Sequence, residues 1–328
     1  MRFIVRRLAF YAVAAWAALT VNFFVPRFMP GNAVEAIMSK FPNLKPSAAK
    51  ALQAMLGVGH PGSIWHQYWS YLDDVGHFNF GTDLINYPAK VSTILGQELP
   101  WTLVLVGTST VIAFFLGTGL GILAGWRSGG WLDRALPALT FVQALPYFFL
   151  ALVLIEVFAL KLTVFPQGQG YAANAVVPGW NWPFISSAVG HSVLPAFSIV
   201  ITSLAGWMLQ MRNVMITTTG EDYVLAAQAK GLRTRRVVLT YAARNAILPQ
   251  LSGFANAIGF VVGGAIVMEI VFSYPGVGLQ LINAVGSNDY PMMQAIFLLI
   301  TFAVLLANLF VDLVYVAVDP RARARSAR

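Results

Sequence analysis

Long apolar stretches separated by short polar segments dominate the hydropathy pattern of this chain. A helix needs about 20 apolar residues to cross the hydrocarbon core of a bilayer. Six stretches meet that requirement, at roughly 8–27, 101–124, 136–160, 190–210, 251–272 and 293–317. The ten-residue alternating units of a membrane β-barrel are absent, so each stretch is predicted to satisfy its backbone polar groups within a helix. The pattern therefore predicts an all-α membrane protein with six transmembrane helices.

Composition agrees with this prediction, because 58% of the residues are hydrophobic and only 10% are charged, whereas charge is near a quarter in soluble domains. The first apolar stretch also resembles a signal peptide, with a basic start and small residues. However, Leu8 to Val25 carries no charge and is longer than a usual signal-peptide core. We expect a retained helix. The absence of cysteine excludes disulfides and thiol chemistry.

The distribution of Lys and Arg predicts how the chain crosses the membrane. Fifteen of the 21 basic residues lie before the first stretch, between the second and third, between the fourth and fifth, or after the sixth. Basic residues accumulate on the cytoplasmic side of membrane proteins. We therefore expect a multi-pass protein of the cell membrane with both termini in the cytoplasm. The net charge of +8 is then explained by topology, and no nucleic-acid partner is predicted.

This topology divides the chain into four parts. They are an N-terminal segment with the first helix (1–28), an extracytoplasmic loop region (29–100), a five-helix core (101–317) that includes a basic loop at 217–249, and a basic cytoplasmic tail (318–328). The aromatic cluster Trp65–Tyr71 in the outer loop is typical of a short helix in the headgroup region. A landing surface for an external partner, or an aromatic ligand patch, is the alternative.

Glycines recur every four residues in two of the apolar stretches. Gly117, Gly121 and Gly125 lie in the second, and Gly259 and Gly263 lie in the fifth. This spacing places a smooth strip on one face of a helix, where another backbone can approach closely. We interpret both strips as packing surfaces rather than as contacts to a substrate.

Three carboxylates, Glu156, Glu269 and Asp312, lie inside or at the edge of the apolar stretches. Each costs roughly 2.5–3.5 kcal/mol at the centre of a membrane helix on insertion scales. Glu269 and Asp312 are expected near helix ends, where water and backbone donors serve them. Glu156 is better placed for a proton relay, although a single group does not make one. All three are kept as possible pathway or structural carboxylates.

Two further signatures are missing from the sequence. The four histidines show no metal-binding spacing, so no metal site is predicted. No GxxxxGK[ST] loop is present, so the chain lacks that device for holding ATP phosphates. Any energy from ATP must then come from a partner.

The basic loop contains the most informative segment, 221–249. Thr219 to Asp222 fits an [ST]-x-x-[DE] capping box, which predicts a helix over 221–230. Gly231 is expected to end that helix in the left-handed conformation. Thr234 is predicted to cap a second helix that ends before Pro249, with an apolar side formed by Val237, Val238, Tyr241 and Leu248.

The side chains of this helix–Gly–helix segment suggest a docking surface. Ala226, Ala227 and Ala229 are small enough for the first helix to enter a groove closely. Three arginines follow, at 233, 235 and 236, and they can meet acidic groups of a partner or anionic lipid. A solvated basic loop explains the arginines but not the small residues before Gly231.

Seven blocks of sequence together resemble the dipeptide/oligopeptide (peptide/nickel) family of ABC-importer permease subunits, in the half with an RRL…PG N-terminus. The blocks are Val5–Leu8 with Met29–Gly31, Trp131–Arg134, Ala227–Gly231, Arg244–Pro249, Phe272–Ser273 with Pro275–Gly278, Asp289–Pro291, and Asp312 with Asp319–Arg321. They follow the family order across nearly the whole chain. Leu225 stands where the family often has Glu, and Asn32-Ala33 replaces a frequent Asp-Pro, which weakens any inference about the substrate.

The resemblance implies the fold of a type I ABC importer permease with a cytoplasmic coupling-helix (EAA) loop. It implies that the following residues contact an ATPase: Tyr223, Ala226, Ala227, Ala229, Lys230, Gly231, Leu232, Arg233, Arg235 and Arg236. The implied partners are a second homologous permease, two ATPase subunits or domains, an extracytoplasmic substrate-binding protein and membrane lipid. ATP and Mg²⁺ would bind to the ATPases, and this chain would be a transport subunit without a catalytic residue or cofactor.

The expected function is the uptake of peptides or a similar solute by alternating access. The same machinery importing oligosaccharides is the alternative. A proton-coupled secondary transporter is the alternative from a different class; it predicts intramembrane charge pairs and inverted repeats, and neither is evident in the sequence.

Overall fold

The computed structural model describes residues 2–29, 63–261, 263 and 266–318. These ranges are helical apart from turns, irregular loops such as 162–181, and one isolated β-bridge between Thr82 and Lys90. The chain forms two compact units. Unit 1 comprises residues 1–101, 262–266 and 275–328, and unit 2 comprises residues 102–261 and 267–274. Helix α5 (Val91–Trp126) begins in unit 1 and continues into unit 2.

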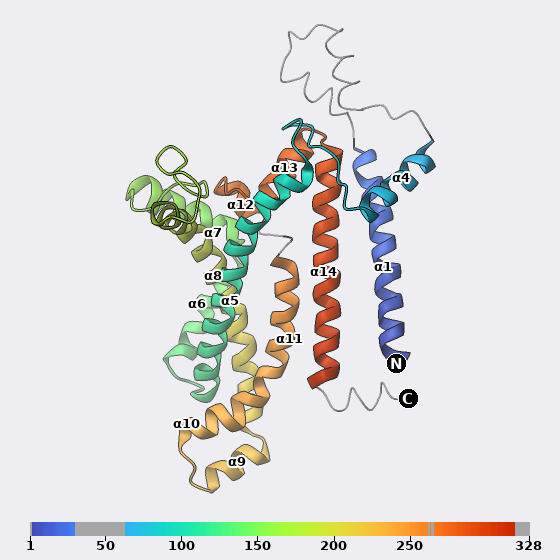
Figure 1. Ribbon diagram of the computed structural model, residues 1–328. Coiled ribbons are helices and arrows are strands. Elements are labelled where there is room, and N and C mark those ends of the chain that lie inside the picture. Colours follow the sequence, from blue (N-terminus) through green and yellow to red (C-terminus); the bar gives the residue numbers. More distant parts are fainter. Residues whose placement is uncertain (1, 30–62, 262, 264–265, 319–328) are drawn as a thin grey trace. The chain divides into compact units, whose positions relative to one another are not determined.

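Unit 1 is built on two long helices that run side by side in opposite directions, α1 (Arg2–Arg27) and α14 (Tyr290–Val318) (Figure 1). A short helix, α4 (Ile64–Gly76), packs on α1 through Tyr68, whose hydroxyl lies 2.7 Å from Thr20 Oγ1. Trp65 and Trp69, one turn apart on α4, are exposed. The aromatic cluster is therefore helical, as expected. Its exposed tryptophans suit both a headgroup layer and an external partner.

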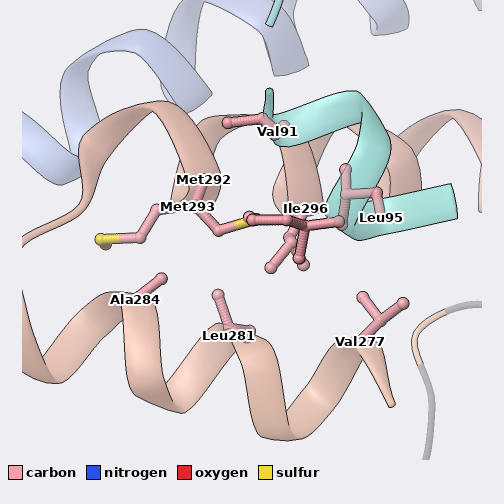
Figure 2. Close-up of a cluster of buried hydrophobic side chains, with 10 residues drawn as sticks. Val91, Leu95, Val277, Leu281, Ala284, Met292, Met293 and Ile296 are labelled. Atoms are coloured by element: carbon pink, nitrogen blue, oxygen red, sulfur yellow. The ribbon is translucent and has the colours of Figure 1, made fainter. Parts of the chain in front are cut away.

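The core of unit 1 lies where three helices meet. Figure 2 shows Val91 and Leu95 of α5 facing Met292 and Ile296 of α14, with α13 (Val277–Gly286) on the other side. Each of these four side chains is less than 10% exposed. The start of α5 belongs to this core, which explains why α5 begins at Val91 rather than near residue 101, and why it continues through Pro100.

Unit 2 carries the remaining helices. In chain order they are α6 (Trp131–Ala144), α7 (Tyr147–Leu154), the π-helix η1 (Ile155–Lys161), α8 (Trp182–Thr219), α9 (Asp222–Ala229), α10 (Thr234–Arg236), the π-helix η2 (Val237–Ala243), α11 (Arg244–Val261) and α12 (Ile266–Val271), whose first residue belongs to unit 1. Helices α9 and α10 lie at one end of the unit, and α7 and α12 lie at the other (Figure 1).

The glycine strip of α5 packs against α8, as its spacing predicts. A Cβ atom on Gly121 would lie 2.6 Å from the carbonyl oxygen of Met208, and one on Gly117 would lie 2.8 Å from that of Leu204. Both distances are shorter than real Cβ contacts, so the two backbones touch only because these side chains are absent. The second strip was predicted wrongly. Helix α11 ends at Val261, and Gly263 lies in a turn rather than on the same helix face as Gly259.

Four helices of the described chain are long and apolar enough to cross a membrane, in α1, α5, α8 and α14. A fifth crossing exists if α6 and the α7–η1 segment are one span, although a bend of 94° separates them. The bend follows from Pro146, which disfavours helical geometry at Leu145 and lacks the N–H to continue the helix. The expected stretch at 251–272 is divided between α11 and α12. The count of six is thus not confirmed.

Candidate coupling site

The segment 221–243, called the elbow here, turns back on itself at one end of unit 2. It consists of α9, a turn at Gly231, α10 and η2. Gly231 has φ +67°, the left-handed conformation that was predicted for it. Its N–H donates to the carbonyl of Gln228 and the N–H of Leu232 donates to that of Ala227, which closes the end of α9. The helix–Gly–helix prediction is confirmed.

The caps of these helices differ from the prediction. Helix α8 continues to Thr219, whose hydroxyl donates to the carbonyl of Ile216 at 2.8 Å instead of capping α9. Glu221 occupies the N-cap position of α9 without a side-chain hydrogen bond. Thr234 is the first residue of α10, and Arg233 precedes it at the cap. Because α8 is longer than the apolar pattern indicated, Thr219 is helical and can only bond back along its own helix.

A buried cluster holds the elbow to the end of α8 and is called the elbow base here. Met211 and Met215 of α8 are fully buried in it. Its other members come from both arms of the elbow and from α11: Val224, Ala227, Val237, Val238, Ala242, Ala243 and Ala246. Burial of a side chain of Val or Met size contributes about 1.5–3 kcal/mol. The elbow is therefore a packed unit rather than a solvated basic loop.

The ten expected contact residues form two groups, according to whether they pack into the elbow base or are exposed. Ala227 is 3% exposed and Leu232 packs against the cluster, so these two residues hold the elbow rather than present themselves to a partner. The other eight are exposed: Tyr223, Ala226, Ala229, Lys230, Gly231, Arg233, Arg235 and Arg236. Leu225, at the position where Glu is frequent in similar sequences, is also exposed, at 48%. A partner would meet a small-residue and aromatic surface next to a basic one.

The second arm does not end at Pro249. Residues 234–261 form one uninterrupted helical run through α10, η2 and α11, with Pro249 inside α11. Prolines are tolerated in helices of membrane proteins because neighbouring helices and local π adjustments satisfy the freed backbone groups. Leu248, expected on the apolar side, is 47% exposed, whereas Val237 and Val238 are buried as predicted. The extra residues of the π-helix change the phase of the helix between Val238 and Leu248.

The structure places Glu269, Glu156 and Asp312 in three different environments. Glu269 is fully buried and accepts a hydrogen bond of 2.7 Å from the Thr102 hydroxyl. Glu269 lies near the end of the short helix α12, as expected, but its burial leaves no exposed surface for water to reach it. Glu156 is exposed and pairs at 3.3 Å with Lys161 of the same π-helix. Asp312 belongs to α14, but its side chain lies outside the described residues.

No sequence pattern predicts the ion pair between α6 and α8. Asp133 and Arg212 form a two-pronged contact, with nitrogen–oxygen distances of 2.8 and 3.0 Å. The sequence contains a signal, since Trp131–Arg134 is one of the similar blocks, but the charge of Arg212 indicates only topology. No group of three or more metal-ligating side chains occurs in the described ranges.

Comparison with known proteins agrees with this architecture. The family model of the "binding-protein-dependent transport system inner membrane component" matches residues 117–324. A putative peptide permease protein of Brucella suis biovar 1 (strain 1330) is 34% identical over 308 residues, 93% of both chains. An oligopeptide transport system permease protein of Bacillus subtilis (strain 168) is 28% identical, over 97% of this chain and 98% of its own. A glutathione transport system permease protein of Escherichia coli (strain K12) is 29% identical, over 98% and 99%.

A solved structure shares the fold. The inward-facing MetNI methionine ABC transporter matches with a TM-score of 0.52 and 17% identity, over 70% of this chain and 97% of its own. The family model covers more than half of the sequence, and it contains the elbow, the glycine strip and the ion pair. The chain therefore belongs to the family of binding-protein-dependent transport system inner membrane components.

Proposed function

We propose that this chain is the permease subunit of an ATP-driven importer and that the elbow is its contact with the ATPase. The observation that carries the proposal is the two-sided construction of the elbow. Its inner side is packed into the elbow base, while Tyr223, Ala226 and Ala229 remain exposed on its outer side. A helix with a small-residue surface can enter a groove closely, and a fixed base lets a push on it reach α8.

The proposed assembly contains a second homologous permease, two ATPase subunits or domains, and a substrate-binding protein on the outer side, all with membrane lipid around the permeases. ATP and Mg²⁺ are assigned to the ATPases because the sequence has no phosphate-binding loop. The basic residues of the elbow and of both chain ends support a cytoplasmic placement of these parts. Lys230, Arg233, Arg235 and Arg236 would meet acidic groups of the ATPase.

Peptides are the proposed solutes. The relatives named above are peptide, oligopeptide and glutathione permeases, and their similarity extends over nearly the whole chain. In the proposed cycle the binding protein delivers the solute, the ATPases close on ATP, and the elbow transmits that closure to the membrane helices. Oligosaccharides are the alternative solute for the same machinery, and a screen of ligands for the cognate binding protein distinguishes the two.

A proton-coupled carrier finds no support in the contacts of Glu156, which is exposed, and Glu269, which is buried. Glu156 pairs with Lys161 of its own segment, and Glu269 accepts from Thr102. These contacts do not connect the two carboxylates into a relay. Solute uptake by the purified chain alone, driven only by an ion gradient, would refute the ATP-driven mechanism.

The variant Ala226→Trp tests the contact with the ATPase. Ala226 is exposed, so the larger side chain leaves the elbow base intact but fills the space a groove needs. We expect the variant to insert normally and to lose copurification with the ATPase. A matched control is Leu251→Trp, since Leu251 is 45% exposed on α11, which lies outside the elbow, and this variant should copurify with the ATPase. Normal copurification and normal stimulated ATP hydrolysis in Ala226→Trp would contradict the proposal.

A further inference from the structure

The Asp133–Arg212 pair joins α6 to the helix that carries the elbow. Arg212 Nε donates to Asp133 Oδ1 at 2.8 Å, and Arg212 Nη2 donates to Oδ2 at 3.0 Å. The Arg212 side chain is 23% exposed and the Asp133 side chain is 13% exposed, so solvent reaches little of the contact. A planar guanidinium that meets both oxygens of a carboxylate fixes orientation as well as distance. The pair is therefore a directional link between two helices.

Each end of the link is held rigidly. In the turn before α6, the backbone N–H of Gly129 donates to Asp133 Oδ2 at 2.8 Å, and Gly129 has φ +82°. On α8, the backbone of Arg212 lies against the glycine strip, because a Cβ atom on Gly125 would be 2.8 Å from its carbonyl oxygen. Little displacement of Arg212 is possible without a matching displacement of Asp133.

The same stretch of α8 is also tied to the elbow. Met211, directly before Arg212, and Met215, one turn later, are the two members that α8 contributes to the elbow base. Their side chains are fully buried against both arms of the elbow. A movement of the elbow therefore reaches the helical turn that carries Arg212.

Helix α6 packs along α8 without fully burying any of its side chains. None of its fourteen residues is buried. Apolar contact along α8 is nondirectional and permits sliding, whereas the forked ion pair does not. Beyond α6 the chain bends by 94° into α7 and η1. A rotation of α6 would consequently be converted into a sideways displacement of the α7–η1 segment.

We propose that Asp133 and Arg212 are positioning residues that carry the displacement of the elbow from α8 to α6. This inference rests on the proposed function, in which an ATPase drives the elbow. The pair does not touch the solute or the nucleotide; it makes the membrane helices follow the elbow. Loss of the link leaves the ATPase able to push α8 while α6 lags behind.

Site-directed spin labels test this order of events, and the chain contains no native cysteine. Gln228→Cys reports on the exposed side of α9, and Phe141→Cys reports on α6, where Phe141 is 66% exposed. The complete importer is reconstituted in lipid vesicles and trapped with ATP and vanadate. In the parent, both labels are expected to change their spectra. With Asp133→Asn, the Gln228 label still changes and the Phe141 label no longer does.

Transport provides a second readout that a purely structural role would not produce. Asp133→Asn is expected to lower solute uptake per ATP hydrolysed at least about fivefold, the lower end of usual coupling factors, using a radiolabelled tripeptide as the probe. Arg212→Lys, which keeps the charge but loses the fork, should give an intermediate ratio. The exchange of both charges, Asp133→Arg with Arg212→Asp, should recover part of it. Arg134→Gln, an exposed neighbour on α6, is the control and should match the parent.

The outcomes separate the link from the function on which it rests. An undiminished response of the Phe141 label in Asp133→Asn, or an unchanged transport ratio, overturns the link alone. A parent in which the Gln228 label does not respond to trapping overturns the proposed function and the link with it. Failure of Asp133→Asn to assemble, together with parent-like behaviour of Arg212→Lys, also overturns the link, since the pair would then serve folding only.

Discussion

At the residue scale, Gly231 shows how one conformation determines the shape of the elbow. Its φ of +67° lies in the region that residues with a Cβ atom rarely adopt. A Cβ atom at this position would nevertheless meet nothing within 4 Å beyond the two chain neighbours. The constraint is therefore backbone geometry and not space. This distinction permits a clean test.

We expect Gly231→Val to lower binding-protein-stimulated ATP hydrolysis strongly, because a β-branched residue is a genuine outlier in this conformation. The cost of such a strained residue is about 1–3 kcal/mol. Gly231→Asn is the matched control, since Asn tolerates the left-handed region. ATPase assays of the reconstituted importer compare the two variants. Equal damage from both would show that the small size of Gly231, not its conformation, is required.

The buried carboxyl group of Asp289 makes the stability of unit 1 depend on pH. Its carboxylate accepts from the N–H groups of Leu84 and Met292, at 2.7 and 3.1 Å. These bonds favour the charged form, but burial outweighs them and, helped by the nearby charge of Asp83, raises the pKa of Asp289 from 3.8 to about 6. The folded protein therefore holds this proton to a higher pH than the unfolded chain does.

The sign of the effect follows from this pKa shift. The stabilising contribution of protonated Asp289 is complete below pH 3.8 and is lost as the pH rises through about 6. Its full size is on the order of 3 kcal/mol, from 1.36 kcal/mol per unit of pKa. Thermal unfolding in detergent at pH 4.5 and 7.5 should show this loss in the parent and a smaller one in Asp289→Asn. The same pH dependence in both proteins would count against the assignment.

At the element scale, the contact between α5 and α8 depends on the missing side chains of the glycine strip. We expect Gly121→Ala to destabilise unit 2 by roughly 1–3 kcal/mol, the usual cost of overpacking. Gly119 lies on the same helix, and a Cβ atom there would meet nothing within 4 Å. Gly119→Ala should be neutral or stabilising by up to about 1 kcal/mol, because Ala favours helix.

Thermal melting of the two glycine variants in the same detergent provides the comparison. The two substitutions add the same methyl group to the same helix, so any difference between them reports on the approach of α8. A Gly121→Ala protein as stable as Gly119→Ala would mean that the two helices separate at little cost.

The sequence predicted the helical class, the packing role of the α5 glycines and the turn at Gly231 because each depends on local pattern. It failed where tertiary contacts decide. The start of α5 is fixed by the unit 1 core around Val91, the end of α8 at Thr219 by the elbow base, and the partner of Glu269 by the approach of Thr102. Asp133 and Arg212 are 79 residues apart in the chain. No local pattern could pair them.

At the scale of the whole molecule, the proposed topology predicts which surfaces are accessible from each side of the membrane. Trp180, in the segment before α8, is 101% exposed, and Gln228 on α9 is also exposed. Because the protein has no native cysteine, single replacements report on one site each. We expect Trp180→Cys to react with a membrane-impermeant maleimide in cells whose cytoplasmic membrane is intact. Gln228→Cys should react only after permeabilisation. The reverse labelling pattern would show that the elbow lies on the outer side of the membrane, where it could not contact the ATPase.

Residues 234–261 form one continuous helical run that joins the elbow to α11. At 1.5 Å per residue it extends for about 40 Å, and because its helical hydrogen bonding is continuous, the direction of each side chain in α11 follows from the orientation of the elbow. One alanine inserted between Leu248 and Pro249 would rotate the far end by about 100° relative to the elbow and turn Gln250 away from the carbonyl of Trp207, to which it donates. Such a chain would keep the elbow but join α11 to it at the wrong angle.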